Sequence, residues 1–364
     1  MTGDDLPVRP ELAGIEPYGA PQLEVSVRLN VNENPYPPPP HVVEAMAAAV
    51  RDAATTLNRY PDREARALRT ALADYLGHGL TAEQVWVGNG SNEVMLHVLQ
   101  AFGGAGRTVL SFAPTYSMYP EYARDTSTRW VVGRRTDDFG IDIDHAVNLI
   151  GQAQPHVVLL ASPNNPTGTA LPLDAVKAIC TVARGVVVVD EAYAEFRRSG
   201  TPSALSLLDD FPRLAVTRTM SKAFALAGGR VGYLAASRDF VDALRVVRLP
   251  YHLSATTQAV ARVALEHRAE LLARVADLRA ERDATAAWLR RQGLDVADSD
   301  ANFVLFGTFG DRHAVWKDLL DHGVLIRETG PEGWLRVSIG TAAEMDAFRQ
   351  ALQATLSSLE EGSS

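Results

Sequence analysis

The stretch Val186-Val187-Val188-Val189-Asp190-Glu191-Ala192-Tyr193 says most about the fold of this 364-residue chain. Four consecutive β-branched residues that end in an acid predict a strand covered on both faces. Continuous apolar strands are typical of a mainly parallel sheet between helices. Asp190 at the strand end either caps a following helix or serves a ligand, and the segment alone leaves both readings open.

Six further short apolar runs surround this strand, and helical patterns such as 93–102 and 173–183 separate most of them. We therefore predict an α/β fold, with a large domain built on a mainly parallel seven-stranded sheet between helices and a smaller α+β domain. The six runs are 85–87, 108–112, 130–132, 157–161, 214–217 and 231–235.

Composition changes along the chain and divides it into three parts. Residues 1–40 form a Pro-rich N-terminal arm that ends in Pro37–Pro40, which we expect to be an extended spacer. Residues 41–250 form the large domain. Residues 251–364 form the small C-terminal domain, with one or two helices over 258–291, strands at 302–306, 324–326 and 334–339, and a helix over 343–359.

The bulk composition excludes several classes of function. A formal charge of −9 argues against non-specific binding to nucleic acid or anionic membranes. Cys180 is the only cysteine, so we expect no internal disulfide and no cysteine-based metal site. We also expect no metal among the site residues. Residues 1–9 lack an apolar signal core and no stretch reaches membrane-span length, which predicts a cytoplasmic protein.

One lysine, Lys222, follows the apolar run 214–217 and is flanked by Thr219, Ser221 and small residues. A lone lysine is usually a solvated surface residue. At a strand end, however, its amine could bond covalently to an aldehyde cofactor whose phosphate the hydroxyls and Arg230 would hold.

Other polar groups also follow predicted strands, where ligands of parallel sheets gather. Asp190 could keep a pyridinium nitrogen protonated, and Tyr193 could donate to a phenolate oxygen or simply pack. Gly88–Asn92 could bind an anion at a helix N-terminus, or Ser91 could be only the N-cap. Tyr116 could stack on a flat ring, and 162–168 is a rigid turn. Nucleotide motifs of the GxxxxGK[ST] or GxGxxG type are absent from the sequence.

Taken in order, these segments resemble the pyridoxal-phosphate aminotransferases of fold type I over nearly the whole chain. Finer motifs are similar to the histidinol-phosphate aminotransferase family. The matching segments are Gly90-Ser91-Asn92, Tyr116, 164–168, Asp190–Tyr193, Ser221-Lys222 and Arg230, with the finer motifs at 29–35, 59–62, 191–196 and 335–341.

The resemblance implies a role for each matched residue. Lys222 would be the catalytic residue, which bonds to the cofactor and moves the substrate proton. Asp190 would pair with the ring nitrogen, Tyr193 and Asn165 with the ring oxygen, and Tyr116 would stack on the ring. The phosphate would be surrounded by Gly90, Ser91, Asn92, Thr219, Ser221 and Arg230, joined by Tyr60 of the other subunit of a homodimer. The substrate would meet Tyr18, Arg327 and Arg336.

The resemblance further implies pyridoxal 5'-phosphate as cofactor and residues 41–250 as the cofactor-binding domain. The implied reaction converts histidinol phosphate and 2-oxoglutarate to imidazole-acetol phosphate and glutamate. A site for both substrates needs anion-binding arginines, and Arg336 and Arg327 are the candidates. An arginine such as Arg327, taken in isolation, is more often a surface ion-pair partner. The nearest alternative is an aromatic (phenylalanine) aminotransferase, and the second is a decarboxylase or carbon–sulfur lyase that uses the same lysine.

Overall fold

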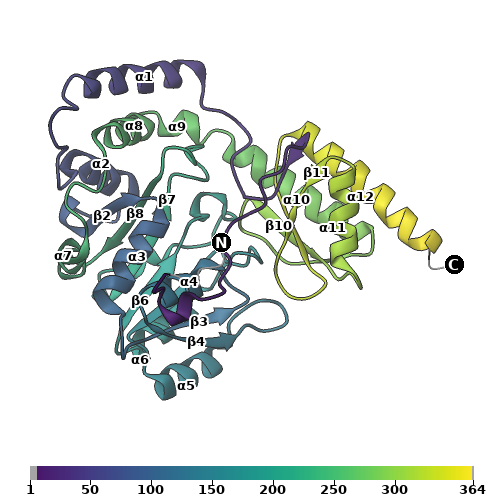
Figure 1. Cartoon of the computed structure of the whole chain (residues 1–364), viewed down its shortest axis with the longest axis horizontal. Coiled ribbons are helices and arrows are strands. Elements are labelled where there is room, and N and C mark those ends of the chain that lie inside the picture. The colour runs from purple at the N-terminus through teal and green to yellow at the C-terminus, as the bar shows by residue number, and fades with distance from the viewer. Residues whose placement is uncertain (1–5, 363–364) are drawn as a thin grey trace.

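The computed structural model describes residues 6–362, and a seven-stranded sheet forms its centre (Figure 1). All seven apolar runs of the sequence are strands of this sheet, as predicted. In sheet order they are β2 (Val85–Asn89), β8 (Val231–Ala236), β7 (Leu214–Thr219), β6 (Val186–Asp190), β5 (Val157–Ala161), β3 (Thr108–Ala113) and β4 (Arg129–Arg134).

The sheet is parallel except for β8, which runs antiparallel to both β2 and β7. The register pairs Asp190 with Ala161 on one side and with Thr217 on the other. Because β8 runs the opposite way, its first residue Val231 lies opposite Asn89, the last residue of β2. Arg230 therefore reaches the edge where the parallel strands end, although it precedes its own strand.

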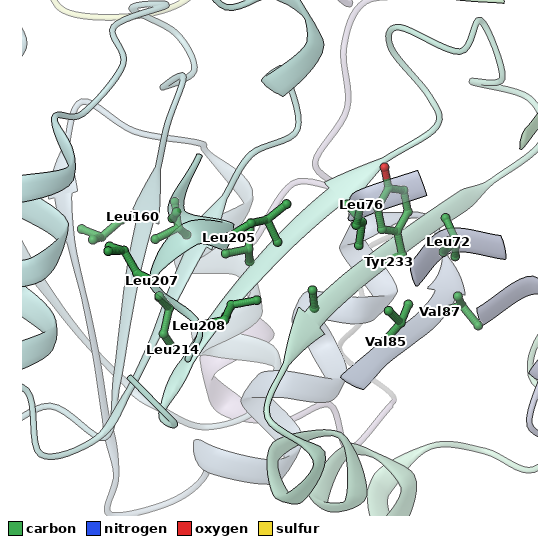
Figure 2. Close-up of a cluster of buried hydrophobic side chains, with 14 of the residues drawn as sticks. Leu72, Leu76, Val85, Val87, Leu160, Leu205, Leu207, Leu208, Leu214 and Tyr233 are labelled. Carbon is green, nitrogen blue, oxygen red and sulfur yellow. The ribbon is translucent and has the colours of Figure 1, made fainter. Parts of the chain in front are cut away.

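Helices bury both faces of the central strands, which explains why β5 and the first four residues of β6 are apolar at every position. Val85 and Val87 face one core, and Trp86 between them faces the other. Figure 2 shows part of the first core, where Leu72 and Leu76 from α2 (Arg66–Leu76) pack near Val85, Val87 and Tyr233. Each such leucine or valine contributes roughly 1.5–3 kcal/mol on burial. The first face is also covered by α5 (Ile143–Ala153) and α6 (Leu173–Val182), and the second by α3 (Ser91–Phe102), α4 (Met118–Asp125) and α7 (Arg238–Val247).

Two predictions about helices were wrong in detail. Pro37–Pro40 is not a spacer throughout, because Pro39 is the N-cap and Pro40 the first residue of α1 (Pro40–Ala54). Proline suits this place since its missing N–H would have no intrahelical partner there. The stretch 258–291 holds three helices rather than one or two: α8 (Ala255–Glu266), α9 (Arg268–Leu271) and α10 (Val275–Arg291).

The C-terminal part forms a second core beside the large sheet. Its four-stranded antiparallel sheet has the order β12 (Arg327–Glu328), β13 (Leu335–Ser338), β10 (Phe303–Gly307), β9 (Asp295–Val296). It packs with α10, α11 (Arg312–Asp321) and α12 (Ala342–Gly362). The N-terminal arm joins this part, because β1 (Val27–Arg28) pairs in parallel with β11 (Val324–Leu325) (Figure 1).

The domain limits at 40 and 250 remain a prediction. Helix α8 packs on α1 and α2, and its Ala261 and Ala264 belong to the core of the large sheet. The sequence-based expectation for residues 1–9 falls partly on residues 1–5, which lie outside the described part of the chain. Within residues 6–362, no helix has both the length and the apolar character needed to cross a bilayer.

Candidate active site

A cavity of about 470 Å³ lies where the strands of the large sheet end, between this sheet, the N-terminal arm and the small sheet. Thirteen of the predicted site residues line it, although they come from segments as far apart in sequence as Tyr18 and Arg336. They are Tyr18, Ser91, Asn92, Tyr116, Asn165, Asp190, Tyr193, Thr219, Ser221, Lys222, Arg230, Arg327 and Arg336.

Lys222 sits in the loop after β7, and its Nζ donates a 2.9 Å hydrogen bond to the Val31 carbonyl oxygen of the arm. Burial lowers the pKa of Lys222 to about 8, and the nearby guanidinium groups of Arg336 and Arg230 act in the same direction. Glu33 opposes them only in part. The amine is therefore much easier to deprotonate than an ordinary lysine, as a nucleophile or proton acceptor requires.

Asp190 ends β6 and lines the cavity. Its carboxylate accepts 3.2 Å hydrogen bonds from the Tyr119 hydroxyl, the Thr217 hydroxyl and the Ala192 N–H. Among the described residues no lysine, arginine or histidine forms an ion pair with it. Burial raises the pKa of Asp190 to about 6, although the three hydrogen bonds lower it. The next helical turn, Ala194–Phe196, has Tyr193 as its N-cap, so Asp190 is not a helix cap.

The start of α3 forms the next wall of the cavity. Gly90 is the N-cap, with φ of +83°, and Ser91 is the first helical residue. The alternative that Ser91 serves as N-cap is therefore wrong, and the cap position of this helix carries no side chain that bonds its first-turn N–H groups. A Cβ on Gly232 would lie 2.0 Å from the Ser91 nitrogen, so glycine is required for β8 to approach the helix start. Free N–H groups at a helix N-terminus attract an anion.

Three side chains complete this anion-favouring corner. The Thr219 hydroxyl donates to Ser221 Oγ at 3.0 Å, and Arg230 Nη1 donates to the same oxygen at 3.3 Å. A Cβ on Gly90 would lie 2.4 Å from Arg230 Nη2, so the glycine leaves room for the guanidinium. Backbone N–H groups, two hydroxyls and one arginine thus converge on one end of the cavity.

Two tyrosines line the middle of the cavity, and their hydroxyls are held by asparagines. Tyr116 donates to Asn92 Oδ1 at 3.5 Å, and its ring meets Tyr119 edge-on with centroids 5.7 Å apart. The Tyr193 hydroxyl accepts from Asn32 Nδ2 at 3.0 Å. Both phenols have raised pKa values because of burial, so they stay protonated donors.

Arg336, in β13, is a buried guanidinium without a carboxylate partner among the described residues. Its Nη2 donates to the Asn30 carbonyl at 2.8 Å and its Nη1 to Asn165 Oδ1, while Nε finds no partner in the described part of the chain. Burial lowers the pKa of Arg336 to about 10, which leaves it charged at neutral pH. A buried, unbalanced guanidinium is suited to bind an anion.

Two further predicted substrate residues lie at the same end of the cavity. Arg327 pairs with Arg336 in the strand register and donates to the Gly19 carbonyl at 3.4 Å. It forms no ion pair within the described residues, so the surface ion-pair alternative finds no partner there. Tyr18 is 46% exposed, and its hydroxyl lies 2.8 Å from Ser117 Oγ. Tyr18 thus contributes to the rim of the cavity.

The structure places one predicted residue elsewhere and adds several that sequence reasoning missed. Tyr60 is 79% exposed, lies outside the cavity of its own chain and stacks on Tyr251 with centroids 4.3 Å apart. The missed residues are Asn32, which donates to the Tyr193 hydroxyl, and Tyr119 and Thr217, which donate to the Asp190 carboxylate. Asn32 lies within the motif 29–35, and Tyr119 lies three residues after Tyr116. Their hydrogen-bond partners come from distant parts of the sequence, so only the folded structure identifies them.

Comparison with known proteins gives an independent result. The family described as "Aminotransferase class I and II" matches residues 24–352. The histidinol-phosphate aminotransferase of Thermobifida fusca (strain YX) is 64% identical over 349 residues, 96% of this chain and 95% of that protein. The histidinol-phosphate aminotransferase of Bifidobacterium longum (strain NCC 2705) is 55% identical over 378 residues, 98% of both proteins.

A solved structure shares the fold. The histidinol-phosphate aminotransferase of Sinorhizobium meliloti in complex with pyridoxal-5'-phosphate superposes with a TM-score of 0.83. The two sequences are 28% identical, and the match covers 92% of each chain.

Proposed function

Because this chain belongs to the class I and II aminotransferase family, we propose that it is a pyridoxal-phosphate-dependent transaminase acting on histidinol phosphate and 2-oxoglutarate. Relatives up to 64% identical that carry the histidinol-phosphate aminotransferase name support this substrate. The single observation that carries the proposal is that one cavity holds both Lys222, with its lowered pKa, and Asp190, which has no cation partner within residues 6–362.

The donor set of the cavity fits pyridoxal phosphate. The α3 start with Ser221 and Arg230 suits its phosphate, and the unbalanced Asp190 suits a protonated ring nitrogen. Tyr193 and Asn165 suit the ring oxygen, and Tyr116 the ring face. When bound, the cofactor supplies an electron-withdrawing ring that stabilises negative charge on the neighbouring substrate carbon.

Lys222 carries the proton chemistry in this proposal. Its Nζ, neutral above about pH 8, accepts the proton from the substrate carbon that bears the amino group. The Val31 carbonyl orients Nζ from the arm side. Asp190 would hold the protonated ring nitrogen of the cofactor and would then be ionised, since that positive charge would offset the cost of its burial.

Arg336 and Arg327 bind the anionic end of either substrate in this proposal. The planar forks of the guanidinium groups match both a phosphate and a carboxylate, which explains how one site takes histidinol phosphate and glutamate in turn. Asn165 and the Asn30 carbonyl hold the Arg336 fork in place. Tyr18 at the rim is placed to close over the bound substrate.

We further propose that the enzyme is a cytoplasmic homodimer in which Tyr60 reaches the phosphate site of the partner. The support is an exposed apolar surface where the segment after α1 lies against the segment after α7, through the stacked Tyr60 and Tyr251. Leu57, Val246 and Leu249 are also more than half exposed there. Mixing Lys222→Ala and Tyr60→Ala dimers and reannealing them should restore up to about a quarter of wild-type activity, because mixed dimers would carry one complete site. No recovery would exclude the crossing of Tyr60.

The cofactor assignment has a sharp chemical test because the chain has only three lysines, Lys177, Lys222 and Lys317. The purified protein should be yellow. Borohydride should remove the visible band and leave the cofactor covalently attached to the Lys222 peptide alone. Attachment to Lys177 or Lys317, both exposed on helices, would contradict the assignment.

A half-reaction panel tests the substrate. The cofactor-loaded enzyme is mixed separately with histidinol phosphate, phenylalanine and tyrosine, and the loss of the visible band is followed. We expect histidinol phosphate to react fastest. A faster reaction with phenylalanine would favour the aromatic aminotransferase, and release of carbon dioxide or a thiol from amino-acid substrates would favour the decarboxylase or lyase.

A further inference from the structure

His41, His267 and Glu270 form a compact cluster outside the active site, at the corner between α1 and the α8–α9 junction. One ligand atom from each lies within 4.8 Å of the others. Glu270 Oε1 lies 2.8 Å from His267 Nδ1, and Glu270 Oε2 contacts His41 Nε2. The two imidazole rings meet edge-on with centroids 5.8 Å apart.

The backbone positions of these three residues are fixed by hydrogen bonds and by buried neighbours. His41 precedes Val42, which is fully buried, and Glu270 precedes Leu271, which is 4% exposed in the same core. The His267 N–H donates to the Val263 carbonyl, and the Glu270 N–H donates to the His267 carbonyl. Helix packing therefore fixes the backbone positions from which the three side chains reach one another.

The surroundings of Glu270 differ from those of an ordinary surface carboxylate. Its ion-pair partners within the described residues are the two histidines, and no arginine joins them. Two nearby arginines point elsewhere, since Arg268 donates to the Leu265 carbonyl and Arg274 pairs with Asp277. The cluster thus places one carboxylate between two imidazole nitrogens.

We propose that His41, His267 and Glu270 form a zinc site. Two imidazole nitrogens and one carboxylate oxygen are a ligand set that zinc takes with a water as its fourth ligand. On binding, the zinc ion would form bonds to one nitrogen of each imidazole and to a Glu270 carboxylate oxygen, and any proton held between these atoms would be released to solvent.

The ion would fasten the first turn of α1 to the α8–α9 corner. From His41 the chain runs back through the prolines to Asn34, whose Nδ2 donates to the carbonyl of Ala223, the residue after Lys222. A cavity of about 620 Å³ lies along this route, with Tyr36, Ala225 and Glu270 among its lining residues. The zinc site would therefore stabilise the segment that leads to the active-site loop, without touching the substrate.

Tag-free holoenzyme, stripped of metal with a chelator, provides the test. Titration with zinc chloride should show one ion per chain by calorimetry and elemental analysis, and should raise the unfolding temperature by about 3 °C. Calcium chloride should give neither effect, because calcium prefers all-oxygen ligands. Equal shifts with both salts would overturn the proposal.

Variants separate this cluster from general surface binding. His41→Gln and Glu270→Gln should each abolish the stoichiometric zinc binding and the thermal shift, while both keep the metal-free transaminase activity. The matched control is His313→Gln, which removes a surface histidine 3.0 Å from Glu328 in a pair that lacks a second histidine. Loss of zinc binding in the control, or its retention in both cluster variants, would overturn the site.

Discussion

Asp190 and Glu191 are consecutive acids at the end of β6, yet their surroundings are built in opposite ways. Glu191 pairs with Arg218 at 2.7 Å and Arg197 at 3.4 Å, and accepts from the Ser203 hydroxyl and the Ala204 N–H. Asp190 has hydrogen bonds but no cation among the described residues. A balanced buried charge belongs to the fold, whereas an unbalanced one signals a missing partner.

The same contrast extends to the cations. Arg218, bound to Glu191, has a raised pKa because the carboxylates of Glu191 and Glu195 outweigh its burial. Lys222 and Arg336 have lowered pKa values because burial and other cations act on them without a matching acid. The cavity therefore holds charged groups that form no ion pair in the described part of the chain. The neighbouring network of Glu191 and Arg218 holds charges that balance each other.

The largest expected effect belongs to Lys222. Lys222→Ala should reduce transaminase turnover by about 10⁴-fold or more, because it removes the covalent attachment and the proton acceptor together. Turnover measures the effect on the active site, and circular dichroism measures the effect on the fold. Lys177→Ala, on an exposed helical surface, should leave both unchanged. Near-normal turnover of the Lys222→Ala enzyme would contradict the proposed mechanism.

Asp190→Asn should lower turnover by about 10²–10³-fold, since a preorganised charge opposite the ring nitrogen is lost. The cofactor-free protein should gain stability at pH 7–8, by up to about 3 kcal/mol. The sign follows from the raised pKa: the folded state holds the Asp190 proton to about pH 6, whereas the unfolded state loses it near pH 4. The fold therefore loses stability between about pH 4 and pH 6, and the full cost of ionised Asp190 is present above pH 6. Denaturant unfolding at pH 5 and 8 measures this gain, which should shrink at pH 5.

Glu191→Gln should show the reverse pattern. Removing the carboxylate leaves Arg218 buried without its main partner, which should cost about 3 kcal/mol of unfolding free energy. Turnover per folded molecule should stay within about twofold of wild type. If Glu191→Gln lost turnover while keeping its stability, the division between satisfied and unsatisfied charges would be wrong.

The smallest effect concerns pH. Addition of pyridoxal phosphate to cofactor-free enzyme should speed up about tenfold per pH unit below pH 8 and level off above it, because only the neutral Lys222 amine reacts. Arg336→Gln should move the profile to higher pH, since Arg336 helps to lower the pKa of Lys222. Stopped-flow absorbance gives the rates. A profile that is flat from pH 6 to 9 would contradict the lowered pKa.

Sequence reasoning predicted the large sheet well because buried strands such as 186–190 leave a strong local pattern. It missed β1, β9 and β12, each of two residues, since so short a strand is defined only by its partner. It also missed the breaks between α8, α9 and α10, because Ala, Leu, Arg and Glu favour helix throughout that stretch.

The site was predictable where a residue ends a strand or follows it closely, as Asp190 and Lys222 do. Arg336 and Tyr18 came from family resemblance, and their placement beside Lys222 depends on the docking of the small sheet and the arm. The Tyr119 and Thr217 bonds to Asp190 have no local signature, because they join three separate elements. Hydrogen bonds between separate elements depend on how the core is assembled, and the periodicity of the sequence does not predict them.

The scarcity of lysine has a practical consequence. Lys177 lies on α6 of the large sheet region and Lys317 on α11 of the small one, and both are about half exposed or more. With Lys222 protected by bound cofactor, a lysine-directed dye has one lysine to react with in each region. A donor and acceptor pair placed there would report, molecule by molecule, whether the two regions move relative to each other when a substrate enters.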